Sequence, residues 1–358
     1  MTTPADPPSG QSIEIAAPAA PIHVASGELG ITAGAARARQ LTSLISRNGA
    51  VAVLVVLLII GSIFDKGFGS FDNLQNVALG ATYIGIISAG MTFVIISGGI
   101  DLSVGSMFAL AVLTSAFMSK HGSFIAIVVP LVCCAGLGML QGLVIARLRL
   151  PAFIVTLAGL TGIRGIVYYI TKEGNTVPKV PAHTSFLTLG QGKLFNITWP
   201  IWITLIVFAV GWWLLNRTAF GQAVQTIGGS RPAAELMGLP VRRVQTLVYV
   251  ISGLCAGFAG ILTTASSSGG QEARIGDSYE LVAIAAVVIG GTLLSGGVGS
   301  MVGTLAGIAI WFVISNLVVH GLQFNTYIQQ VVSGGVLLLV VVLQTMLSKR
   351  VSAAAANR

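Results

Sequence analysis

The sequence has few charged residues. Of its 358 residues only 8% are Asp, Glu, Lys or Arg, whereas 54% are hydrophobic. A soluble domain carries about 25% charged residues, because charge covers its water-facing surface. This scarcity excludes an ordinary soluble protein and indicates that lipid covers much of the surface. The expected fold class is therefore an all-α polytopic membrane protein.

Cysteine and histidine are also scarce. The three cysteines, Cys133, Cys134 and Cys255, lie in apolar runs without CxxC spacing or a nearby histidine, so we expect no metal site. The four histidines fall in the tail, in loops or at the ends of apolar runs. A proton relay would need acids or histidines within the membrane. The scarcity of such residues argues against an ion-coupled secondary transporter. We keep that class of protein only as an alternative function.

The sequence lacks the patterns of nucleotide and nucleic-acid binding. There is no Walker A motif, because Gly192-Lys193 has neither the earlier Gly nor the following Ser or Thr. The net charge of +8 comes from residues scattered between apolar runs, without the basic stripe typical of nucleic-acid binding. We expect no catalytic residue and no cofactor in this chain. Any ATP-Mg would be bound by a partner ATPase.

Long apolar runs dominate what is present. A membrane-spanning helix needs about 20 mostly apolar residues. The sequence predicts about ten transmembrane helices, at Gly49–Phe64, Val77–Ile100, Leu102–Met118, Phe124–Ala146, Ala152–Ile170, Ile197–Leu215, Val244–Thr264, Leu281–Leu294, Met301–Val319 and Tyr327–Leu347.

The basic residues predict the orientation of these spans. With the N-terminal tail inside, the inner segments hold twelve Lys and Arg residues, the outer segments hold six, and Arg164 lies within a span. Basic residues are enriched on the cytoplasmic side, so both termini are expected in the cytoplasm. We expect a disordered tail at 1–45, because it is rich in Ala, Pro, Gly, Ser and Thr. A transmembrane permease domain at 46–348 and a second cytoplasmic tail at 349–358 would follow.

Glycines at four-residue spacing recur within the predicted spans. Small residues at this spacing let helix backbones approach closely in lipid. They predict tight packing within one subunit, with a mobile or dimeric interface as the alternative. The glycines concerned are Gly138, Gly142, Gly253, Gly257, Gly299, Gly303 and Gly307.

The segment Gly90–Ser106 places an acid between two apolar stretches with almost no loop between them. Asp101 follows Gly98-Gly99, and glycines permit backbone conformations that other residues resist. The helix is therefore expected to break here, as transporter helices do where backbone lines a cavity. The candidate residues for a translocation pathway or gate are Thr92, Ser97, Gly98, Gly99, Asp101 and Ser103.

Two interpretations stay open for each intramembrane charge. Asp101 either contacts substrate or a gate, or it caps the N-terminus of the next helix, where a carboxylate is favoured. Arg164 either extends to the membrane interface, or it pairs with an acid or a substrate oxygen.

Three blocks resemble one family of transporters, over roughly residues 46–347. They are Gly90–Ser106, Ile227–Val241 running into Val248–Leu254, and Tyr279–Leu281 continuing to Gly290-Gly291-Thr292 and Ser295-Gly296-Gly297. Together they resemble the ribose- and xylose-type permeases of bacterial ATP-binding-cassette importers. Branched-chain amino-acid permeases share this architecture and remain the alternative within the family.

The resemblance implies a coupling helix near 230–239 that docks in a cleft of the ATPase. Its residues would be Ser230, Arg231, Ala233, Ala234, Glu235, Leu236 and Gly238. Pro232 departs from the polar residue common there, but proline suits a first helical turn, so we expect the helix to begin there.

The resemblance further implies a place and an assembly. The chain would lie in the bacterial inner membrane and import a monosaccharide of the ribose or xylose type. Its partners would be cytoplasmic ATPase subunits, an external sugar-binding protein and a second permease subunit, most simply an identical one.

Overall fold

The computed structural model describes residues 49–63, 67–181, 185–267 and 272–321, and the single positions 328, 331, 334, 335, 338 and 342. All of these lie within one compact unit, Ser43–Arg358. The predicted tails at 1–45 and 349–358 lie outside the described residues, as does nearly all of the tenth predicted span, Tyr327–Leu347.

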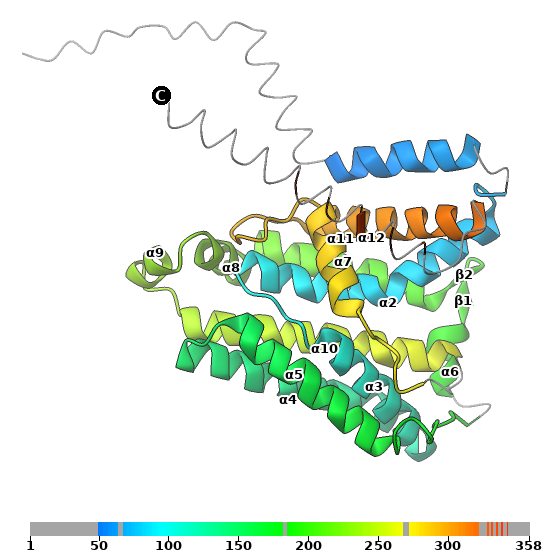
Figure 1. Ribbon diagram of the computed structural model, residues 1–358, viewed down its shortest axis with the longest axis horizontal. Coiled ribbons are helices and arrows are strands. Elements are labelled where there is room, and N and C mark those ends of the chain that lie inside the picture. The colour runs from blue at the N-terminus through cyan, green and yellow to red at the C-terminus, as the bar shows by residue number, and fades with distance from the viewer. Residues whose placement is uncertain are drawn as a thin grey trace, which may run out of the picture. The chain divides into compact units, whose positions relative to one another are not determined.

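Helices make up most of the described chain (Figure 1). After an apolar helix at Gly49–Ile63, they are α2 (Phe71–Ile96), α3 (Val104–Met118), α4 (Ser123–Leu148), α5 (Ala152–Ile170), α6 (Ser185–Gln191), α7 (Trp199–Arg217), α8 (Ala219–Gly229), α9 (Arg231–Leu236), α10 (Val241–Ser267), α11 (Tyr279–Ile289) and α12 (Met301–Asn316). A 3-10 turn at Ser119–His121 follows α3, and a π-turn at Leu317–Gly321 follows α12. Strands β1 (Lys193–Leu194) and β2 (Ile197–Thr198) form a short antiparallel pair.

The chain is a polytopic membrane protein, as predicted. Six of the described helices are long and apolar enough to cross a membrane: α2, α4, α5, α7, α10 and Met301–Val319. Each predicted span before Tyr327 overlaps one of these six, the shorter helix Gly49–Ile63, α3 or α11. Helices α3 and α11 have only 15 and 11 residues, fewer than the roughly 20 that a full span needs.

Capping residues decide where several helices begin. Helix α2 starts at Phe71, before the predicted Val77, because the Ser70 side chain accepts a hydrogen bond from the Asn73 N–H. Residues 216–243 form the loop between the sixth and seventh predicted spans, and the prediction of one short helix there, near 230–239, was incomplete. That loop also contains α8, which begins after its N-cap Thr218 and buries Val224 and Ile227. The outer loop 171–196 likewise contains α6.

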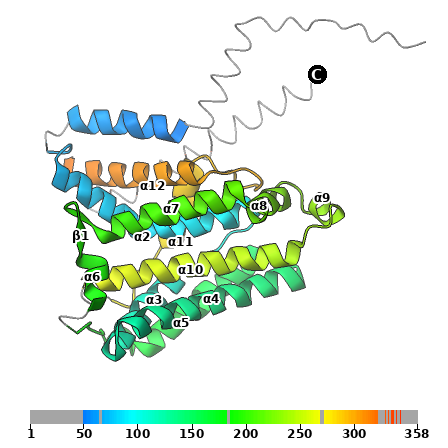
Figure 2. The same ribbon diagram turned by 180° about the vertical axis from the view of Figure 1, so that it is seen from behind.

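Helix α10 lies between α2 on one side and α4 and α5 on the other (Figures 1 and 2). Glycine makes this packing close: Gly138 on α4 lies against the backbone of Tyr249, and Gly253 on α10 lies against the carbonyl of Cys134. Since a side chain at either position would meet backbone atoms, the predicted packing within one subunit is confirmed. The same holds for Gly142, Gly303 and Gly307, whereas Gly257 lies mainly against the side chain of Cys134.

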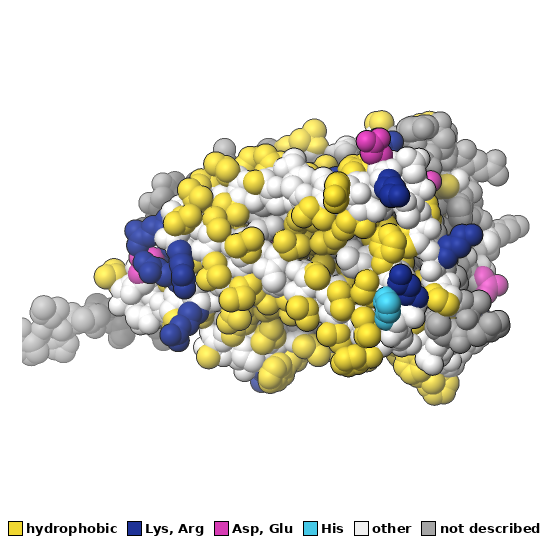
Figure 3. All heavy atoms as spheres, turned by 90° about the horizontal axis from the view of Figure 1, so that it is seen from below, with side chains coloured by type: hydrophobic (Ala, Val, Ile, Leu, Met, Phe, Trp, Pro, Cys, Tyr) yellow, Lys and Arg dark blue, Asp and Glu magenta, His cyan; other side chains and the backbone are white. Residues whose placement is uncertain are grey.

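The surface carries an apolar band. Figure 3 shows one face on which hydrophobic side chains lie between charged groups gathered at its two ends. Exposed apolar residues on α4, α5 and α7 include Val132, Leu140, Phe153, Ile154 and Ile206. A face of this kind suits lipid in the middle and water or headgroups at both ends.

Candidate translocation and coupling sites

The chain leaves α2 at the pair of glycines that predicted a helix break, and the break is present. The N–H groups of Ser97, Gly98 and Gly99 turn back to carbonyls of the last turn of α2, at 2.9–3.0 Å. Gly98 has a φ of +83°, a left-handed conformation that costs glycine little. The segment that follows runs back beside α10 before α3 begins at Val104 (Figure 1).

Asp101 lies in this returning segment and is completely buried. Its Oδ1 accepts hydrogen bonds from the N–H of Ser103 at 3.0 Å and from the Ser103 hydroxyl at 2.6 Å. Its Oδ2 accepts a third, at 2.7 Å, from the hydroxyl of Ser252 on α10. The carboxylate therefore fastens the segment to α10 and to the start of α3. The N-cap of α3 is Ser103, so Asp101 stabilises this helix start from two residues before the cap.

Further polar groups surround this carboxylate. The Ser103 oxygen lies 3.1 Å from Oε1 of Gln141 on α4. Ser103 has a single hydroxyl proton, which it donates to Asp101. The Gln141 amide must therefore turn its NH2 group, and not its oxygen, toward the Ser103 hydroxyl. The buried hydroxyl of Tyr249, which lies close to Gly99, has no hydrogen-bond partner within the described chain. The result is a sealed polar cluster joining the break, α4 and α10.

The other predicted pathway residues bond elsewhere. Thr92 is buried and its hydroxyl lies 2.8 Å from that of Thr304 on α12, while the Ser97 hydroxyl donates to the carbonyl of Val94 at 2.8 Å. No predicted pathway residue lines the cavity of about 330 Å³ between α7 and α12. That cavity is lined by Leu205, Phe208, Ala209, Trp212, Met301, Val302 and Leu305.

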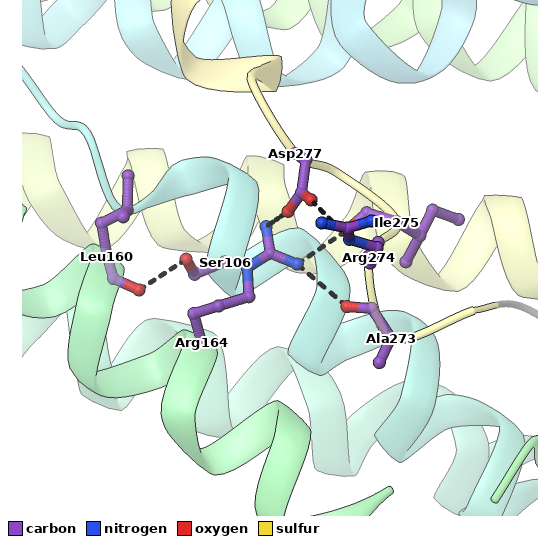
Figure 4. Close-up of polar contacts among 7 residues, drawn as sticks. All are labelled: Ser106, Leu160, Arg164, Ala273, Arg274, Ile275 and Asp277. Carbon is purple, nitrogen blue, oxygen red and sulfur yellow. Dashed lines mark hydrogen bonds and ion pairs between the residues drawn. The ribbon is translucent and has the colours of Figure 1, made fainter. Parts of the chain in front are cut away.

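Arg164 holds the segment that leads into α11 (Figure 4). Its Nη1 donates to the carbonyls of Ala273 at 3.1 Å and Ile275 at 2.9 Å, and its Nη2 lies 3.0 Å from Oδ1 of Asp277. Of the two predicted alternatives, the structure shows pairing with an acid. Nearby, the Ser106 hydroxyl donates to the Leu160 carbonyl at 2.8 Å, which joins α3 to α5.

The residues that complete these networks escaped the sequence prediction. Ser252 and Gln141 are polar residues in apolar helices, and Asp277 lies in a short connection, so none stands out by type. Spacing gave no signal either, because Ser252 lies 151 residues from Asp101 along the chain.

The short helix predicted near 230–239 is present as α9, although it is somewhat shorter than expected. Ser230 is its N-cap and accepts from the N–H of Ala233, and the helix begins at Arg231 with Pro232 in its first turn. Proline fits there because the first N–H groups of a helix have no partner within it. Arg231 and Glu235 form an ion pair at 3.2 Å, one turn apart.

Two large apolar side chains project from the end of this helix. Leu236 is 90% exposed and Met237 is 70% exposed. Ala234 is fully buried against the chain itself, so its side chain contributes nothing to the outward surface. Gly238 ends the helix with a φ of +75° and has open space where a side chain would lie. The exposed surface of α9 therefore carries an ion pair and ends in a short apolar tip.

Known proteins resemble this chain along most of its length. The model of the family described as branched-chain amino acid transport system permease components matches residues 73–341. The ribose import permease protein RbsC of Haemophilus influenzae is 38% identical over 292 residues, which cover 80% of this chain and 90% of that protein. No solved structure matches the chain.

Two further relatives have similar coverage. The L-arabinose ABC transporter permease protein AraH of Azospirillum brasilense is 36% identical over 310 residues, covering 86% of this chain and 90% of that protein. The inner membrane ABC transporter permease protein YjfF of Escherichia coli is 36% identical over 316 residues, which cover 84% of this chain and 93% of that protein.

Proposed function

This chain belongs to the family of branched-chain amino acid transport system permease components, and we propose that it is the membrane-spanning subunit of an importer for a monosaccharide of the ribose or xylose type. The observation that carries the proposal is the similarity to ribose and arabinose permeases over four fifths or more of both chains. A permease of this family does no covalent chemistry. A separate ATPase subunit hydrolyses the ATP.

The buried charges support a neutral solute over an amino acid. A zwitterion would be matched by a free acid and a free base in the pathway. Both oxygens of Asp101 are occupied by Ser103 and Ser252, and Arg164 is occupied by carbonyls and Asp277. Sugar hydroxyls can bond to neutral hydroxyl and backbone groups, which the broken helices supply.

We infer ten spans in the bacterial inner membrane, with both termini in the cytoplasm. The distribution of basic residues supports this orientation, and so does the description of one relative as an inner membrane protein. The orientation places α8, α9 and the break after α2 on the cytoplasmic side.

Helix α9 would then dock on the ATPase. Residues 230–238 supply what such contact needs: a capped, ion-paired helix that ends in exposed Leu236 and Met237. Apolar side chains this exposed at a membrane protein's aqueous end favour a protein partner over solvent. Since α10 follows α9 after four residues, movement of α9 would pass directly into the centre of the bundle.

The break at Gly98–Ser103 would act as the gate region. Asp101 contributes by fixing the returning segment, since both its oxygens are already bonded within the protein. Thr92, Ser97, Gly98, Gly99 and Ser103 set the path of the chain on either side of it. The complete assembly would contain two ATPase subunits, an external sugar-binding protein and a second copy of this chain.

Reconstitution in vesicles tests the proposal. The chain is assembled with its proposed partners, an ATPase and a sugar-binding protein, and uptake of labelled ribose, xylose, arabinose and leucine is measured. We expect ATP-dependent uptake of one pentose that vanadate stops and an uncoupler does not. Uptake of leucine alone would indicate the amino-acid alternative, and abolition by the uncoupler would indicate the secondary transporter.

A further inference from the structure

Helices α3 and α12 both begin within copies of one sequence pattern. Gly98-Gly99 is followed by Leu102-Ser103 and then by Val104-Gly105-Ser106-Met107. Gly290-Gly291 is followed by Leu294-Ser295 and then by Val298-Gly299-Ser300-Met301. Each copy comes directly after a helix, α2 or α11, and leads into the next one. The second copy has Thr292-Leu293 in place of Ile100-Asp101 and an insertion of two residues, Gly296-Gly297.

This insertion contacts the first copy through backbone atoms. The Gly297 N–H donates to the carbonyl of Ile96, the last residue of α2, at 2.8 Å. A side-chain carbon at Gly296 would lie 3.0 Å from the Cα and N atoms of Gly98 and 2.9 Å from the carbonyl oxygen of Gly228. Gly296 and Gly297 have φ values of +84° and +80°, so both need glycine. The insertion therefore joins the break after α2 to the break after α11.

The third member of this contact comes from the inner loop. Gly228 lies in the last turn of α8, two residues before the N-cap of α9. A side-chain carbon there would collide with the Ile96 carbonyl and lie 2.6 Å from the Gly297 N atom. The next residue, Gly229, points into open space, where a side-chain carbon would meet nothing within 4 Å. The backbone of Gly229 also lies at this contact, since a side-chain carbon at Gly297 would lie 2.9 Å from the Gly229 Cα, but of the two adjacent glycines only Gly228 would place its own side chain against it.

We propose that Gly228, Gly296 and Gly297 form a joint through which displacement of α9 reaches both helix breaks at once. The proposal rests on the proposed function, because it assumes that an ATPase moves α9. The atoms nearest to these three glycines are all backbone atoms, which cannot change rotamer to absorb a shift. Close-packed contacts of this kind transmit displacement. A move of α8 would therefore displace the end of α2 and the loop between α11 and α12 together.

A matched pair of substitutions tests the joint in the reconstituted assembly. Gly228→Ala and Gly229→Ala add the same methyl group to adjacent residues of α8, one against the joint and one in open space. The measurement is the ratio of sugar taken up to ATP hydrolysed, for the sugar that the wild-type assembly transports best. We expect Gly228→Ala to lower this ratio by about tenfold while the assembly still hydrolyses ATP, and Gly229→Ala to leave it unchanged.

The ratio separates a joint from a merely structural role. Misfolding lowers uptake and assembly-dependent hydrolysis together and leaves the ratio unchanged, whereas a broken joint lowers the ratio. An unchanged ratio in assembled Gly228→Ala would overturn the proposal. If the wild-type assembly takes up none of the tested solutes with ATP, the proposed function fails, whatever the variants do.

A second pair of substitutions tests the joint if the Gly228→Ala variant does not assemble with the ATPase. Gly296→Ala and Gly291→Ala impose the same backbone strain, since the φ values are +84° and +90°, but only Gly296 lies against the joint. We expect the ratio to fall for Gly296→Ala and to stay near the wild-type value for Gly291→Ala. If the two variants have equal ratios of sugar taken up to ATP hydrolysed, any effect comes from backbone strain alone. That result would overturn the proposed joint.

Discussion

The hydroxyl of Ser252, roughly midway along α10, donates a 2.7 Å hydrogen bond to Oδ2 of Asp101, in the segment between α2 and α3. Both residues are fully buried. This bond connects α10, the helix that follows α9, to the break where α2 ends. An unpaired charge at this depth would be costly, so the bond and its partners at Ser103 make the buried carboxylate tolerable.

Asp101→Asn should lower both thermal stability and uptake. Asparagine keeps the shape but replaces one acceptor oxygen with an NH2 group, so at least one of the three donors loses its partner. An unsatisfied buried donor costs about 1–3 kcal/mol. Uptake at equal membrane abundance and the melting temperature of the purified protein measure the effect. Asp72→Asn, the same change at the exposed start of α2, serves as the control. Wild-type melting and uptake in Asp101→Asn would contradict the role assigned to this carboxylate.

The effects of Asp101→Asn and Ser252→Ala should not add. Each substitution removes one side of the same hydrogen bond, so the double variant should lose less stability than the sum of the two single losses. Residues in direct contact show coupling energies of about 0.5–3 kcal/mol in such cycles. The coupling energy is obtained by measuring the free energy of unfolding of the wild type, the two single variants and the double variant in the same detergent. Strict additivity would show that this bond carries no stability.

Leu236→Asp should detach the ATPase. The side chain is 90% exposed at the tip of α9, so the change costs the permease little stability but places a charge in the proposed docking surface. Co-purification of a tagged ATPase should be lost, and ATP-dependent uptake with it. Phe195→Asp makes the same kind of change at a residue that is 82% exposed in the predicted outer loop, and it should leave co-purification intact. Retention of the ATPase by Leu236→Asp would exclude α9 as the docking element.

Arg164→Lys should loosen the segment before α11. A lysine cannot bond two carbonyls and a carboxylate in the geometry of the guanidinium. Hydrogen exchange of the amides at 272–278 should accelerate by about tenfold, as expected for the loss of one charge-assisted hydrogen bond. The control is Arg274→Lys, because that side chain is 79% exposed and lies 3.9 Å from Asp277. Equal exchange in the two variants would argue against Arg164 as the anchor of this segment.

Single cysteines should report the orientation of the spans. Lys179→Cys and Ser230→Cys both lie at exposed positions, the first in the predicted outer loop and the second before α9. Each is placed in a chain from which Cys133, Cys134 and Cys255 have been removed. An impermeant thiol reagent added to intact cells should label Lys179→Cys but not Ser230→Cys. The reverse pattern would invert the topology.

The sequence by itself determined the membrane character, the positions of the six long apolar helices and the location of the helix break. Each of these follows from local properties. Apolar length sets a span because lipid cannot satisfy backbone polar groups, and Gly98-Gly99 permits a turn that other residues resist. The short helix at α9 could likewise be predicted, because Ser230 and Pro232 suit a helix start.

Only the tertiary structure decided which groups pair inside the bundle. Asp101 meets Ser252, Arg164 meets Asp277, and Gly228 meets Gly297 across separations that no local pattern encodes. In lipid the apolar faces of all helices are nearly equivalent, so hydropathy cannot specify which helices become neighbours. Close backbone approach at glycines and the need to satisfy every buried polar group made that choice, and both depend on where the whole chain lies in space.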